Sequence, residues 1–115
     1  MRLAPGAVVI GGWEWEHFKF IADLVTHKVL GREGACTAGT NGKHSTDSLH
    51  YYGRAWDLRV WKHPTDASKG RWDNDKCEQY ADFLRSALGC YFDVVVHYDE
   101  TRTYVTHIHV ELDHD

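Results

Sequence analysis

The chain has 115 residues, of which 43% are hydrophobic and 26% are charged. These values predict one soluble globular domain and exclude a disordered chain or a second catalytic module of ordinary size. The formal net charge of −4 disfavours a nucleic-acid partner, because proteins that bind phosphate backbones concentrate Lys and Arg. Every apolar run is shorter than a membrane span, so we expect no membrane insertion. We also expect a monomeric protein.

The cysteines are three in number, widely spaced and without a CxxC pair, which predicts reduced thiols. They are Cys36, Cys77 and Cys90. The stretch 1–6 carries a single basic residue, and the apolar run that follows it is too short for a signal peptide. We therefore expect synthesis in the cytoplasm.

Apolar residues recur at helical steps over 13–30, starting with Trp13, and Gly31 follows as a stop signal. This pattern predicts an amphipathic helix that packs on a sheet. A loop composition follows over 34–48, in which only 35–38 resembles a short strand. His44 in this loop is a candidate for substrate contact, and an exposed loop histidine is an equally good interpretation.

Residues 55–61 alternate in polarity, with Trp56 on one face of the predicted strand and Asp57 on the other. A second helix is predicted over 74–88, with a cap at Asp73 or Asn74 and a stop at Gly89. Two β-rich runs then form a predicted hairpin, 91–98 and 102–112, joined by 99–101. The expected fold is a small α+β domain, in which two main helices pack on an antiparallel sheet.

Two histidines, His107 and His109, lie in the last predicted strand. Its alternation places five residues on one face: Thr103, Val105, His107, His109 and Glu111. One imidazole could bind a metal while its neighbour faces a substrate. A single HxH pair is weak evidence by itself, because such pairs also occur by chance.

A second candidate for metal binding is the stretch 48–57, in which His50 and Asp57 lie on either side of Gly53. Glycine frees the backbone for a tight turn, and a divalent cation would compensate a carboxylate that is costly to bury alone. Imidazole nitrogen and carboxylate oxygen both suit Zn²⁺. Three protein ligands with one open position are typical of a catalytic zinc site.

The two stretches together resemble the SxHxxGxAxD and HxH signature of the zinc D-alanyl-D-alanine carboxypeptidase family. The matching residues are Ser48, His50, Gly53, Ala55 and Asp57, followed by His107 and His109. This family includes phage L-alanyl-D-glutamate endopeptidases and vancomycin-resistance D-Ala-D-Ala dipeptidases, and the Hedgehog signalling domain is a fold relative. The resemblance implies a sheet that holds one Zn²⁺ ion.

By motif position, the resemblance implies that His50, Asp57 and His109 bind the zinc. His107 would then lie beside the scissile carbonyl. Many relatives carry a glutamate general base three residues before the ligand histidine, where this chain has Thr106. We therefore assign the proton transfer to His107, with Glu111 and His97 as less favoured substitutes.

Two further residues of the motif region are weaker candidates for substrate contact. Ser48 is expected to support the loop or the ligands, and Arg54 could meet a carboxylate of the substrate. Each could equally be an ordinary structural residue.

The implied activity is hydrolysis of an amide bond in peptidoglycan stem peptides at the bacterial cell wall or periplasm. The enzyme would be a D,D-carboxypeptidase or an L-alanyl-D-glutamate-type endopeptidase, such as a phage lytic enzyme. Two alternatives stay open. One is a zinc-containing binding module without catalysis, and the other is a virion structural protein whose histidines bind no metal.

Overall fold

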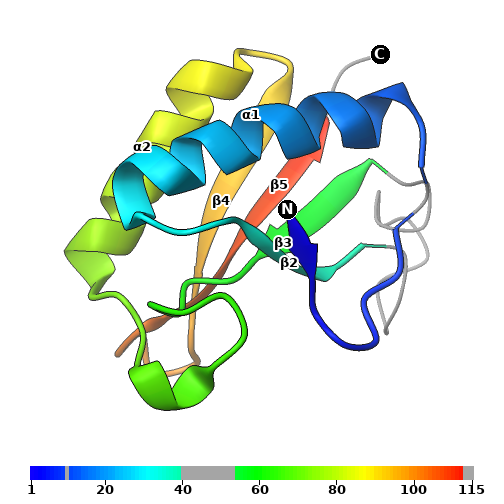
Figure 1. The fold of residues 1–115 in the computed structure, drawn as a ribbon. Coiled ribbons are helices and arrows are strands. Elements are labelled where there is room, and N and C mark those ends of the chain that lie inside the picture. Colours follow the sequence, from blue (N-terminus) through cyan, green and yellow to red (C-terminus); the bar gives the residue numbers. More distant parts are fainter. Residues whose placement is uncertain (10, 40–53, 113–115) are drawn as a thin grey trace.

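The computed structural model describes residues 1–9, 11–39 and 54–112. They form an α+β domain in which two helices pack on one five-stranded sheet (Figure 1). The strand order is β1-β2-β3-β5-β4. The strands are β1 (Arg2–Leu3), β2 (Ala35–Ala38), β3 (Ala55–Leu58), β4 (Phe92–Tyr98) and β5 (Val105–Leu112).

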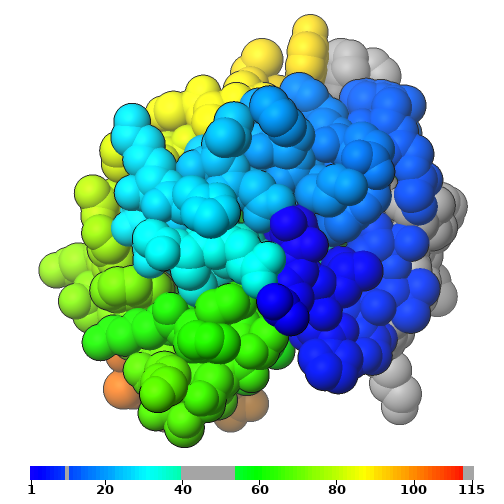
Figure 2. Space-filling view, in the orientation of Figure 1, coloured from blue at the N-terminus to red at the C-terminus, as the bar shows by residue number. Residues whose placement is uncertain are grey.

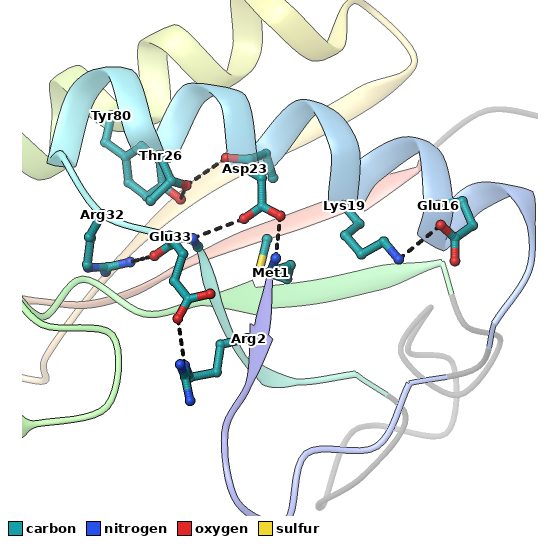
Figure 3. A network of polar contacts seen from close by, with 11 residues as sticks. Met1, Arg2, Glu16, Lys19, Asp23, Thr26, Arg32, Glu33 and Tyr80 are labelled. Atoms are coloured by element: carbon teal, nitrogen blue, oxygen red, sulfur yellow. Dashed lines mark hydrogen bonds and ion pairs between the residues drawn. The ribbon is translucent and has the colours of Figure 1, made fainter.

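The sheet is mixed, so the expectation of an antiparallel sheet was wrong at one edge. Strand β1 pairs with β2 in parallel, whereas the other three pairings are antiparallel. Two residues are too short for a period-two pattern, which is why the sequence did not reveal β1. The terminal ammonium of Met1 binds the carboxylate of Asp23, which also accepts a hydrogen bond from Gly34 N, and these contacts fix β1 beside β2 (Figure 3).

Both predicted helices are present, as α1 (Trp13–Leu30) and α2 (Asn74–Leu88). Helix α1 ends at Gly31, whose φ of 68° is a left-handed conformation that glycine adopts without a Cβ clash. Helix α2 begins where the Asp73 carboxylate accepts a 2.8 Å hydrogen bond from Lys76 N. The stop signal of α1 and the start signal of α2 are therefore local.

The buried face of α1 differs in part from the predicted one. Its core residues are spaced three and four apart: Trp15, Phe18, Ala22, Val25 and Val29. The predicted apolar pattern starts with Trp13, yet Trp13 is 67% exposed, and the apolar Phe20 and Leu24 are 65% and 57% exposed. Apolar residues occur all around this helix, so periodicity alone could not select the packed face.

The two helices cover the same face of the sheet, as Figure 1 shows, and α1 lies across the surface seen from this side in Figure 2. Between helix and sheet, Phe18 of α1 stacks on Trp56 of β3 with ring centroids 4.4 Å apart. Trp56 is fully buried. Because strand side chains alternate, this packing directs the neighbouring Asp57 to the other face of the sheet.

A buried hydrogen-bond chain joins the two helices. Thr26 Oγ1 donates to Ala22 O at 2.6 Å and lies 2.6 Å from Tyr80 Oη, so the tyrosine hydroxyl must be the donor to Thr26 (Figure 3). Burial raises the pKa of Tyr80 to about 12.

We expect Thr26→Val to lower the free energy of unfolding by about 1–3 kcal/mol, because it leaves the buried Tyr80 hydroxyl without its acceptor. Tyr80→Phe should cost only about 0.5–1.5 kcal/mol, because Thr26 keeps its bond to Ala22. Urea unfolding of the two variants measures this order. A larger loss for Tyr80→Phe would show that the donor assignment is wrong.

Cys36 and Cys77 are buried and Cys90 is exposed, and all three are free thiols. Neither described helix has both the length and the apolar character needed to cross a membrane.

Candidate metal and catalytic site

The candidate site lies on the face of the sheet opposite to the two described helices. On β5, Ile108, Val110 and Leu112 are buried in the core, and the residues between them are half-buried. Period-two alternation therefore places His107, His109 and Glu111 together on the other face, as predicted.

Asp57 and His109 lie directly opposite each other in the ladder between β3 and β5. Asp57 Oδ1 is 2.9 Å from His109 Nδ1, and the two side chains are only 14% and 16% exposed. Each is held between buried neighbours, Trp56 and Leu58 on β3 and Ile108 and Val110 on β5. The sheet thus brings together two of the three predicted zinc ligands, which are 52 positions apart in the sequence.

His109 has a second carboxylate partner, because its Nε2 lies 2.8 Å from Glu111 Oε1. Burial by itself lowers the pKa of His109, but the hydrogen bonds and negative charges of Asp57 and Glu111 outweigh it, so the pKa lies above its ordinary value. The two carboxylates therefore favour the protonated form of the imidazole. From the sequence, Glu111 was predicted only as a substitute base. Its place two positions after His109 was the signal for this contact.

His107 lies beside this pair, with Nε2 3.7 Å from Asp57 Oδ1. Its ring stacks on that of His97 across the β4–β5 ladder, with centroids 4.6 Å apart and planes 9° from parallel. The Nδ1 atom of His107 lies 3.0 Å from Thr106 Oγ1. Two neighbours therefore hold the ring of the predicted general base.

Strand β5 contains a β-bulge next to His107. His97 pairs with His107 but Tyr98 pairs with Val105, so Thr106 is an extra residue in the ladder. The bulge reverses the alternation, and Val105 is 1% exposed in the core. Its predicted place on the face of His107 was therefore wrong.

The donor set of Asp57 and His109 fits a zinc ion. Two ligand atoms of one tetrahedral zinc lie ~3.3 Å apart, given metal–ligand distances of about 2.0–2.2 Å. The observed 2.9 Å between Asp57 Oδ1 and His109 Nδ1 is a few tenths of an ångström shorter. Within the ranges 1–9, 11–39 and 54–112, no group of three His, Cys, Asp or Glu side chains is arranged to hold a metal.

Three predicted site residues, His44, Ser48 and His50, lie outside the described residues, so the third predicted zinc ligand is among them. Arg54 is described and precedes β3. It lines a cavity of about 300 Å³ with Trp13, Tyr91 and Phe92 among its walls. Asp57, His107 and His109 do not line this cavity. Among the described residues, the cavity beside Arg54 is therefore separate from the Asp57–His109 pair, and the role of Arg54 in substrate binding stays a prediction.

Comparisons of the chain with protein-family models, with curated proteins and with solved structures found no match.

Proposed function

We propose that the protein is a zinc-dependent peptidase that hydrolyses an amide bond in peptidoglycan stem peptides, on a fold of the D-Ala-D-Ala-peptidase and Hedgehog type. The observation that carries the proposal is the Asp57–His109 pair, whose Oδ1 and Nδ1 atoms lie 2.9 Å apart on the face of the sheet opposite to α1 and α2. The SxHxxGxAxD and HxH motifs connect this pair to the peptidoglycan peptidases. The protein would act on the bacterial cell wall, as a phage lytic enzyme or a bacterial peptidase.

The zinc ligands in this proposal are Asp57, His109 and His50. The contact of Glu111 with His109 Nε2 supports binding of the metal through Nδ1, the nitrogen that faces Asp57. Carboxylates that bind the remote nitrogen of a ligand histidine fix its orientation and raise its basicity. When bound, the ion supplies a Lewis acid that polarises the scissile carbonyl and lowers the pKa of a water molecule to about 7.

His107 would transfer the proton. A water oxygen attacks the carbonyl carbon, and the imidazole takes the water proton at Nε2. It then donates this proton to the leaving amine as the C–N bond breaks. The proximity of Nε2 to Asp57 Oδ1, 3.7 Å, supports this assignment because it puts the base beside the predicted ligands.

The proposal is tested by incubating purified peptidoglycan with the protein and analysing the muropeptides by mass spectrometry. We expect cleavage of one stem-peptide bond, loss of cleavage after chelation and recovery with added Zn²⁺. The mass change also distinguishes trimming of a terminal residue from internal cleavage.

A zinc-containing binding module is the second candidate function. The observation that favours it is Thr106, a residue that cannot act as the carboxylate base found at this position in many relatives. Zinc bound in unit stoichiometry without cleavage of any muropeptide would support the binding module and refute the peptidase.

A further inference from the structure

The bulge in β5 gives Thr106 two polar neighbours. Its Oγ1 lies 3.1 Å from the backbone oxygen of His97 and 3.0 Å from Nδ1 of His107. Both distances are within the range of good hydrogen bonds. Bulges next to active sites commonly redirect a side chain, and here the redirected side chain is a hydroxyl that contacts the imidazole beside it.

The chemistry of the three groups fixes the direction of both hydrogen bonds. A backbone carbonyl only accepts, so the single hydroxyl proton of Thr106 is donated to His97 O. The hydroxyl oxygen can then only accept from His107, which requires a proton on Nδ1. If Thr106 Oγ1 instead donated its proton to His107 Nδ1, the lone pairs of Thr106 Oγ1 and His97 O would face each other.

In a neutral imidazole, a proton on Nδ1 leaves the lone pair on Nε2. His107 Nε2 is the atom that lies 3.7 Å from Asp57 Oδ1, and stacking on His97 restrains the plane of the ring. We infer that Thr106 is a positioning residue, which holds His107 in the Nδ1–H tautomer and presents the Nε2 lone pair to the reacting groups. The tautomer follows from the contacts alone, whereas its consequence for catalysis rests on the proposed function.

The tautomer can be measured by ¹⁵N NMR of the zinc-free protein, at a pH where the histidines are neutral. We expect the His107 shifts of an Nδ1–H imidazole in the wild-type protein. His63 provides an internal reference of the opposite kind, because its Nδ1 accepts a hydrogen bond from Thr65 N at 3.1 Å. Thr106→Val should populate the Nε2–H tautomer of His107 and leave His63 unchanged, whereas Thr106→Ser should match the wild type. An Nε2–H tautomer in the wild-type protein, or no change in Thr106→Val, would overturn the inference.

Kinetics provide the second test. We expect Thr106→Val to lower kcat by about 10–100-fold, the usual effect of losing an orienting contact, with KM and zinc content unchanged. Thr106→Ser should restore most of kcat. A loss that is shared by the serine variant, or that appears in KM, would exclude the positioning role. If the wild-type protein cleaves no peptide, the proposed function fails, and the NMR comparison still decides the tautomer.

Discussion

Replacing Asp57 with alanine is expected to abolish zinc binding. The carboxylate supplies one of three predicted protein ligands, and its Oδ1 lies 2.9 Å from the Nδ1 atom of a second ligand, His109. Loss of a ligand should weaken binding beyond the roughly 10–100-fold caused by loss of an orienting partner. Titration of the metal-free variant with Zn²⁺ in a calorimeter measures the affinity, and circular dichroism shows whether the variant is folded.

Two further variants provide zinc affinities with which that of Asp57→Ala can be compared. Glu111→Gln removes the carboxylate charge beside His109 Nε2 but no predicted ligand, so it should weaken zinc binding by about 10–100-fold without abolishing it. Asp82→Ala is the matched control, because Asp82 is an exposed carboxylate on α2 that pairs with Arg85. Its zinc affinity should equal that of the wild type. Wild-type affinity in a folded Asp57→Ala protein would remove Asp57 from the ligand set.

Replacing His107 with alanine is expected to separate catalysis from metal binding. The imidazole is the predicted general base and not a predicted ligand, so the variant should keep one zinc ion and lose about 10²–10⁴-fold in kcat. Zinc content and muropeptide release are measured on the same preparation. His63→Ala, which removes an exposed histidine in a loop, should change neither value.

Comparing the alanine variants of His107 and His109 tests which histidine of the HxH motif binds the metal. His109→Ala should lose zinc together with activity, because His109 is itself a predicted ligand whose Nδ1 faces the ligand Asp57. If His107→Ala loses the metal and His109→Ala retains it, the ligand within the pair is His107, and the assignment of the general base must change with it.

The helices and the face of β5 that carries the site could be predicted from the sequence because their signals are local. Gly31, Asp73 and Gly89 mark the observed helix ends. The packed side of α1 could not be predicted from the helix sequence alone. Whether Trp15 or the exposed Trp13 is buried depends on which side chains of the sheet face the helix. Here Trp15 packs near Trp56, with ring centroids 6.3 Å apart.

The cross-strand contacts of the site depend on register, which the sequence did not reveal. The predicted hairpin loop of 99–101 is longer in the structure because the Asp99 carboxylate accepts hydrogen bonds from Thr103 N and Tyr104 N. Arg102 within it has a φ of 56°. The longer loop and the bulge at Thr106 together pair His97 with His107. The stacking that holds the predicted base therefore follows from turn geometry and not from residue spacing.

The Asp57–His109 pair could also be predicted only in part from the sequence. The motifs predicted that both residues bind one metal, but only the order β3-β5-β4 explains how they meet, since it places β5 directly beside β3. Strand order in a sheet depends on how the whole chain packs.

The proposed zinc ion on this face of the sheet is tested most directly by elemental analysis of the purified, dialysed protein. We predict one equivalent of zinc per chain in the wild-type protein and none in Asp57→Ala. A wild-type protein that is folded and contains no bound transition metal, even after incubation with Zn²⁺, would contradict the metal site and with it the proposed peptidase.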